Sequence, residues 1–161
     1  MLTIVSTIVC LYRENGVTRI FTIGCGGKSA QQFFETLIEA KVRKVADVRL
    51  YNTSQLAGFA KRGDIEYFLG AIAGIAYVHL SIMAPTKELL NDYKKGHISW
   101  PEYEIRFNRI IAERQIEKHL AASETDMACL LCSEPKPDHC HRRLVAEYLA
   151  GVWQNTSICH L

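Results

Sequence analysis

Residues 19–38 read RIFTIGCGGKSAQQFFETLI and contain the unit that decides the fold. The apolar run Arg19–Gly24 predicts a strand, and the glycines that follow predict a tight turn. Ser29 and Gln32 then have the spacing of a capping box, which marks the start of a helix. The buried face of that helix is indicated by Phe33, Phe34, Leu37 and Ile38. A strand therefore turns directly into a helix.

The same alternation continues along the chain. Further strands are predicted at Lys44–Leu50, Ile75–Leu80, Met127–Cys132 and Ser157–Leu161. Helices are predicted at about Asp64–Ala73, Pro85–Tyr93, from Ser99 through an apolar stripe ending at Leu120, and at His141–Ala150. Strands that alternate with helices form parallel sheets with crossover helices. We predict an α/β fold, a three-layer sandwich with a mostly parallel sheet and helices on both faces, of the Rossmann-like or flavodoxin-like kind.

Length and composition set the outer limits. The 161 residues suit a single domain spanning 1–161, with no linker or internal repeat. Residues 1–17 form an atypical apolar extension, which we interpret as an added strand and not a membrane anchor, because Arg13 comes too early for a span of roughly 20 residues. The net charge of +2 excludes a global basic field.

Six cysteines in a chain that is 48% hydrophobic do not require disulfides. We therefore expect reduced thiols and a cytoplasmic protein. The sequence indicates no oligomeric state.

Polar residues follow three of the predicted strands. In parallel α/β sheets the ligand crevice lies beyond the carboxyl ends of the strands. This rule brings together Gly24, Cys25, Lys28, Asp47, Arg49, Cys132, Cys140, His141 and Arg142. We expect a small anionic ligand or a nucleic acid to bind there.

The segment GCGGKS lacks the first glycine of a phosphate-binding nucleotide loop, since Thr22 occupies that position. Lys28 and the helix N-terminus could still bind an anion, and a simple glycine turn with a solvated lysine is the alternative. Asp47 and Arg49 point to the same side of a strand. They predict either a structural ion pair or a guanidinium that a carboxylate orients toward an anion.

Cys132 ends a strand, and Cys140 and His141 begin the last long helix, for which Asp138 is the expected cap. Cysteine-phosphatase chemistry needs an arginine where Asp138 stands, so that class is disfavoured. Three interpretations remain open. The thiols are reactive, with Cys132 as nucleophile, Cys140 as resolving thiol and His141 as acid or base; they bind a metal; or they pack the turn.

In the metal interpretation Cys132, Cys140, His141 and Cys25 would hold zinc, although their spacing is not a standard zinc signature. No cofactor is otherwise indicated. Cys129 faces the opposite side of its strand from Cys132 and is interpreted as core.

Four stretches also follow one another in a familiar order: TIGCGGKSAQQFF (22–34), VADVRLYNTSQLAGFAKRGDIEYFL (45–69), APTKELLNDYKKGHISWPEYEIRF (84–107) and LLCSEPKPDHCHRRLVAEYL (130–149). From Thr18 to Leu161 the chain resembles the YeaO-like family, domain of unknown function four-eight-eight. The resemblance implies no activity. The positions it marks are Gly24, Asp47, Arg49, Cys132, Glu134, Cys140, His141 and Arg142. Many relatives have histidine where this chain has Cys25.

The leading hypothesis is a thiol-dependent enzyme for an anionic substrate. Cys132, Cys140, His141 and Asp47 are its catalytic candidates, and Arg49 and Arg142 with Lys28, Gly24 and Cys25 are its anion-binding candidates. The alternative is a non-catalytic metal-binding or ligand-binding module that uses the Cys132, Cys140 and His141 turn. Paired basic residues also suggest a nucleic-acid binder, but such pairs are usually solvated.

Overall fold

A five-stranded sheet forms the centre of the computed structural model, which describes residues 16–53 and 58–161. Its strands are β1 (Thr18–Gly24), β2 (Lys44–Asp47), β3 (Ala76–His79), β4 (Ala128–Cys132) and β5 (Thr156–His160). Their order is β3-β2-β4-β1-β5, and every neighbouring pair is parallel. The prediction of a mostly parallel sheet is confirmed.

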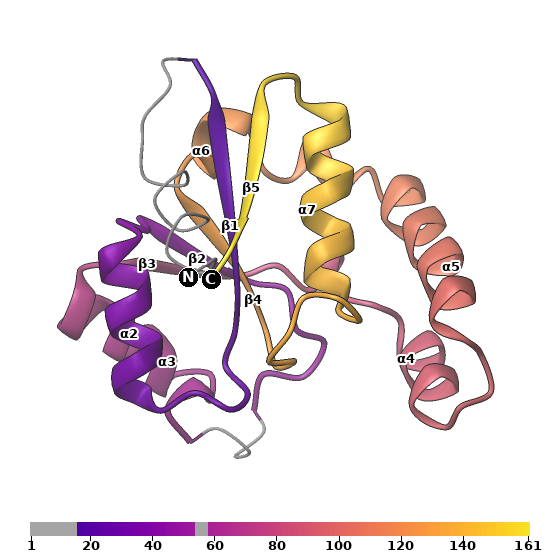
Figure 1. Cartoon of the computed structure of the whole chain (residues 1–161), viewed down its shortest axis with the longest axis horizontal. Helices are drawn as coiled ribbons and strands as arrows, with labels where there is room; N and C mark the ends of the chain where they lie inside the picture. The colour runs from indigo at the N-terminus through magenta and orange to yellow at the C-terminus, as the bar shows by residue number, and fades with distance from the viewer. Residues whose placement is uncertain (1–15, 54–57) are drawn as a thin grey trace, which may run out of the picture.

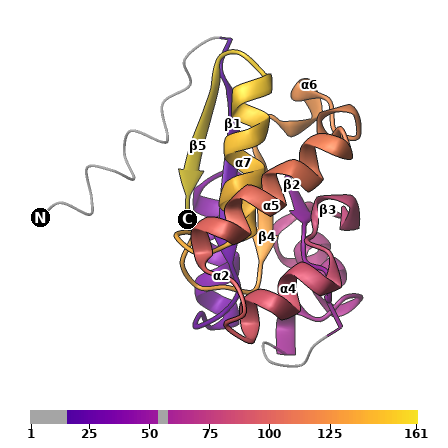
Figure 2. The same cartoon turned by 90° about the vertical axis from the view of Figure 1, so that its right-hand side faces the viewer.

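The helices lie on both faces of this sheet. They are α2 (Ala30–Glu39), α3 (Asp64–Phe68), α4 (Lys87–Lys94), α5 (Trp100–Glu113), α6 (Ala122–Thr125) and α7 (His141–Val152). Figure 1 shows α2 and α3 on one side of the sheet, and α7 and α5 on the other. Figure 2 views the second layer from outside and shows α5 crossing α7. The predicted three-layer sandwich is confirmed.

Each helix layer has its own hydrophobic core. On one face Phe33 and Leu37 of α2 pack with the sheet residues Phe21 and Ile23. On the other face the core is made by buried side chains of α5, α7 and the sheet, among them Phe107, Ile111, Leu144, Val145 and Leu130. Burial of both sheet faces explains why the strands read as continuous apolar runs.

The start of α2 is as predicted. Ser29 Oγ accepts from the backbone N–H of Gln32, and Gln32 Oε1 accepts from the backbone N–H of Ser29. The capping box therefore satisfies two donors that the first helical turn would leave unpaired. Ile38 was expected on the buried face but is largely exposed.

Several element bounds differ from the predictions. Helix α5 is the longest helix of the described chain, but it ends at Glu113 because Gln115 adopts a left-handed conformation (φ 50°). The remaining residues form the separate 3-10 turn η4 (Ile116–Lys118). The predicted helix 64–73 is split into α3 and the π-helical turn η2 (Leu69–Ala73). Strand β2 ends at Asp47, three residues earlier than expected.

Two further short turns, η1 (Gly58–Ala60) and η3 (Ser81–Met83), lie in the connections after β2 and β3. The added strand proposed for the N-terminal extension falls mostly on residues 1–15, which lie outside the described residues. The single-domain assignment stays a prediction. Among the described residues, the helices are too short or too polar to cross a bilayer.

The ends of β1 and β4 continue side by side into the loops that follow. The backbone N–H of Cys25 donates to Cys132 O at 3.0 Å, and that of Gly26 donates to Ser133 O at 2.9 Å. A Cβ atom added to Gly24 would lie 1.8 Å from the backbone oxygen of Glu134. Glycine at this position therefore lets the loop after β4 cross the end of β1.

Replacing Gly24 with alanine should consequently destabilise the protein. Because the clash is with backbone atoms, the chain must shift, and we expect the free energy of unfolding to fall by about 2 kcal/mol or more. Urea denaturation followed by circular dichroism measures this. The control is Gly151→Ala in α7, where an added Cβ meets nothing within 4 Å and stability should be unchanged or rise by up to ~1 kcal/mol. Equal stability of the two variants would contradict the proposed role of Gly24.

Candidate functional site

The carboxyl end of β4 and the start of α7 bring two thiols and an imidazole together. Cys132 is the last residue of β4, Cys140 is the N-cap of α7 and His141 is its first residue. All three side chains are buried, and their ligand atoms lie within 4.8 Å of one another. The predicted convergence of these three residues is thus present in the structure.

The imidazole of His141 is held in one orientation. Its Nε2 lies 2.8 Å from the carbonyl oxygen of Val48, just beyond β2. A carbonyl only accepts, so Nε2 carries the hydrogen of this bond. The other nitrogen, Nδ1, lies 3.7 Å from Cys132 Sγ. Nδ1 is therefore the atom that exchanges a proton with the thiol.

The surroundings of Cys132 favour its thiolate. A hydrogen bond from the Cys140 thiol, together with the charge and hydrogen bond of His141 and the backbone N–H of Glu134, brings the pKa of Cys132 well below its usual 9.0 despite burial. The same hydrogen bond and burial raise the pKa of Cys140. Burial lowers the pKa of His141, but the Cys132 thiolate outweighs it and raises that pKa above 6.5. These three directions favour a thiolate at Cys132 beside an imidazolium at His141, with the proton retained on Cys140.

The expected cap of α7 is wrong. The N-cap is Cys140, without a side-chain capping bond, and the backbone oxygen of Asp138 instead accepts a hydrogen bond from Nη2 of Arg143 at 3.1 Å. The backbone N–H of Arg143 in this first turn donates to the Cys140 carbonyl oxygen at 3.1 Å.

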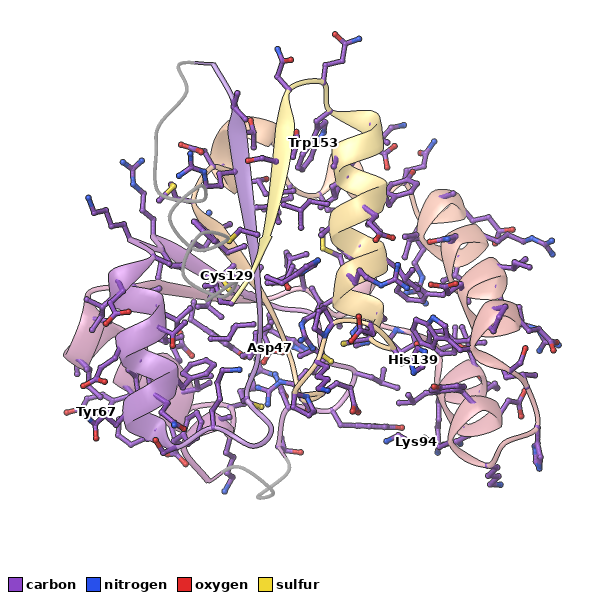
Figure 3. The ribbon with its side chains drawn as sticks, viewed as in Figure 1. Asp47, Tyr67, Lys94, Cys129, His139 and Trp153 are labelled. Carbon is purple, nitrogen blue, oxygen red and sulfur yellow. The ribbon has the colours of Figure 1, made fainter. Side chains whose placement is uncertain are left out.

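The second part of the site is a buried ion pair after β2. Arg49 Nε and Nη2 donate to the two carboxylate oxygens of Asp47 at 2.8 and 2.6 Å, and Nη2 also donates to Ala60 O at 2.8 Å. Tyr77 donates its hydroxyl to Asp47 Oδ2 at 2.7 Å, and Asn52 donates to that hydroxyl at 3.3 Å. The carboxylate is thereby held from two sides. Figure 3 shows Asp47 in the middle of the molecule, between the helices of the two faces.

The pKa values in this network are those expected when Asp47 and Arg49 are paired away from water. Burial would lower the pKa of Arg49, but its bonds to Asp47 raise it. Burial and the bond to Asp47 raise the pKa of Tyr77 to about 12. Asp47 and Arg49 therefore form the ion pair that sequence reasoning allowed, with Asp47 orienting the guanidinium.

Arg142 is fully buried and binds the loop after β4. Its Nη1 donates to Glu134 O at 2.6 Å and its Nη2 to Pro135 O at 3.3 Å, while its Nε has no partner among the described residues. These contacts hold the loop that leads to Cys140. A role of Arg142 in anion binding stays a prediction.

The first loop contributes backbone more than side chains. Gly24 and Cys25 lie against the loop after β4, and Cys25 is a buried thiol whose pKa is raised by burial. Burial and the charge of Arg142 lower the pKa of the half-buried Lys28. Cys25 is not in the compact group formed by Cys132, Cys140 and His141.

The thiols of the described chain are mostly reduced, as expected. Cys25, Cys129, Cys132 and Cys140 are free and buried, and full burial raises the pKa of Cys129, in accord with its interpretation as core. Cys159 differs from the expectation because it is disulfide-bonded.

A cleft of about 450 Å³ opens beside the cluster of Cys132, Cys140 and His141. Its lining includes Cys132, Cys140 and His141, together with Arg49 from the ion pair. Its aromatic residues are Tyr51, Tyr93, Trp100, Tyr103 and His139. Sequence reasoning missed this aromatic wall. The apolar stripe that begins after Ser99 predicted a helix here, but nothing in it showed that Tyr103, near the start of that helix, borders the thiols.

Fold and site together define a parallel α/β protein with a buried cysteine–histidine pair at its strand ends. The sequence pattern of the family described as domain of unknown function DUF488 matches residues 29–149. This covers more than half of the 161 residues, so the chain belongs to that family, in agreement with the resemblance noted from the sequence. No curated protein and no solved structure matches the chain.

Replacing Asp47 with asparagine tests the buried ion pair. The guanidinium of Arg49 would lose its counter-charge inside the protein, and we expect the free energy of unfolding to fall by about 3 kcal/mol or more. The matched control is Glu102→Gln, which removes the carboxylate of an exposed pair with Arg106 and should cost no more than ~1 kcal/mol. Thermal and urea unfolding measure both; a loss at Asp47 no larger than the loss at Glu102 would contradict this assignment.

Proposed function

We propose that this protein is a thiol-dependent enzyme that acts on a small anionic substrate in the cleft beside Cys132. The observation that carries the proposal is the position of Cys132 Sγ, 3.7 Å from Nδ1 of an imidazole whose other nitrogen is bound to Val48 O. A nucleophile, a base within reach and a group that orients the base are the parts of nucleophilic catalysis. Here a backbone carbonyl does the orienting.

Each residue then has a role. The Cys132 thiolate attacks an electrophilic centre of the substrate, and the imidazolium of His141 gives its Nδ1 proton to the leaving group. Arg49, oriented by Asp47, binds the anionic part of the substrate. Cys140 donates a hydrogen bond that stabilises the thiolate. We propose the cytoplasm as the compartment, because Cys25, Cys129, Cys132 and Cys140 are all free thiols and a reactive thiolate persists where thiols stay reduced. The disulfide at Cys159 is the observation that argues against this compartment.

The reactivity of Cys132 toward iodoacetamide tests this function without knowledge of the substrate. Only the thiolate reacts, so the alkylation rate should rise with pH and reach its plateau well below the usual thiol pKa of 9.0. His141→Ala removes the positive neighbour of the thiolate. We expect it to shift the profile to higher pH and to slow alkylation at pH 6.5 at least about tenfold.

Mass spectrometry of the alkylated peptide identifies the thiol. The control is His97→Ala, an exposed histidine beside Asp92, which should leave the profile unchanged. A Cys132 profile centred at the usual thiol pKa in the wild-type protein would refute the proposed nucleophile.

The compact cluster of two cysteines and one histidine also supports a second candidate function, a zinc-binding module. Cys132, Cys140 and His141 supply donor types that zinc prefers, and the bond from His141 Nε2 to Val48 O is the outer contact usual for a ligating histidine. These three residues would hold the ion, and a bound zinc would act as a Lewis acid there.

Elemental analysis separates the two candidates. Protein purified without chelator should contain far less than one zinc per chain if the thiols act as a nucleophilic pair. Stoichiometric zinc that is lost in a Cys140→Ser variant, with Cys132 protected from alkylation until the ion is removed, would overturn the thiol enzyme in favour of the metal site.

A further inference from the structure

One donor of the buried ion pair is left over. Arg49 is 5% exposed, and its Nε and Nη2 are fully engaged with Asp47 and Ala60 O. Its Nη1 makes no hydrogen bond within the described chain. Among the described residues, the side-chain nitrogens that are both buried and unpaired belong to Arg142 and Arg143, which each have such an Nε. Nη1 of Arg49 is unpaired but is not one of these buried atoms, so it keeps contact with solvent. Since Arg49 lines the cleft, a directed and immobile N–H donor is available to a ligand.

The cleft also offers an aromatic ring without a partner. Tyr51 lines it, is 54% exposed and contacts no other ring among the described residues. Other rings of the cleft are already packed, because Trp100 stacks on Tyr103 with ring centroids 5.0 Å apart and has the Arg143 guanidinium over its ring. The ring of Tyr93 contacts both rings of that stack, with centroids 5.4 Å from Trp100 and 5.1 Å from Tyr103. Tyr51 is therefore the ring that is free to stack on a planar group.

Size and charge limit what fits. A cleft of about 450 Å³ falls within the ~300–1,000 Å³ of small-molecule sites and exceeds what a lone phosphate needs. Its charged side chains are Arg49, which Asp47 neutralises, Lys94 and Glu134, and the thiolate of Cys132 and the imidazolium of His141 offset each other. Figure 3 shows Lys94 and His139 on the α4 and α5 side of the strand ends. So few cations suit one or two negative charges, whereas a nucleic-acid strand needs a longer run of phosphate contacts.

We infer that the cleft binds a mononucleotide, whose phosphate accepts from Arg49 Nη1 and whose base stacks on Tyr51. This inference rests on the proposed function, because it names the substrate class for the same site. The phosphate would lie close to the Cys132 thiolate, and the exposed ammonium of Lys94 at the rim would add a second contact. The base would lie over the aromatic side of the cleft.

Isothermal titration calorimetry with AMP and UMP tests the inference on the wild-type chain. We expect saturable binding of at least one of them, and much weaker binding of adenosine and of inorganic phosphate, because each retains only half of the contacts. Tyr51→Ala should weaken nucleotide binding about 5- to 150-fold, the range for loss of one base stack. Lys94→Ala should weaken it less.

The matched control is Tyr67→Ala. Tyr67 is also an exposed tyrosine (69%), but it lies on α3, on the other face of the sheet (Figure 3), and its loss should change affinity by less than about twofold. The inference is overturned if neither nucleotide binds, if phosphate alone binds as well as AMP, or if Tyr51→Ala has no effect. Tight, strongly salt-dependent binding of a single-stranded oligonucleotide with no binding of mononucleotides would overturn it in favour of a nucleic-acid site.

The nucleotide-binding test and the thiol-reactivity test can fail independently of each other. Alkylation of Cys132 needs no nucleotide, so a reactive thiol without AMP binding would defeat only the substrate class. Nucleotide binding to a chain with an unreactive Cys132 would defeat the enzyme proposal and leave a nucleotide-binding module. If both hold, saturating AMP should slow alkylation of Cys132.

Discussion

The hydrogen bond from His141 Nε2 to the carbonyl of Val48 joins the two halves of the site. Val48 follows β2, and its own N–H donates to Leu131 O next to the end of β4. Both backbone groups of Val48 are thus used, one to extend the sheet and the other to hold the imidazole. Because a carbonyl can only accept, the bond also decides which nitrogen faces Cys132. Orientation and proton chemistry of the pair follow from one contact between β2 and α7.

The buried charges around this contact are costly unless each one is paired. Asp47 accepts two hydrogen bonds from the Arg49 side chain and neutralises its charge. Tyr77 donates a further hydrogen bond to Asp47, and Asn52 donates to the Tyr77 hydroxyl. Arg142 binds backbone carbonyls of the loop after β4, while its Nε lacks a partner in the part of the chain that the structure describes. A network that is rigid and desolvated in this way can present a donor or a thiolate without reorganising, which is what catalytic and binding sites require. Gly24 must remain small for a steric reason, because a Cβ atom there would lie 1.8 Å from the backbone oxygen of Glu134 where the loop crosses β1.

Much of the fold and part of the site were predictable from the sequence. The capping box at Ser29 and the apolar runs identified α2 and the strands, since these signals are local. The strand-end rule selected Cys132, Cys140 and His141 together, and they do meet. Asp138 was wrongly expected to cap α7, because capping depends on where the loop delivers the chain, which no local pattern states. Arg142 was grouped with the anion-binding candidates; its guanidinium donates to carbonyl oxygens of the loop that precedes it, which no local pattern indicated, and its role in anion binding stays a prediction.

Local periodicity and the alternation of strands with helices determined the parallel α/β architecture of this protein, because burial on one or both faces of an element leaves its mark on neighbouring residues. The strand order, the orientation of the His141 ring, the free Nη1 of Arg49 and the aromatic wall of the cleft were decided only by the tertiary structure. Each of these depends on contacts between residues far apart in the chain, such as Val48 with His141, or Arg49 with the cleft that Trp100 also lines. Hydrogen-bond partners and solvent exposure at such positions are properties of packing, and the order of residues does not encode them locally.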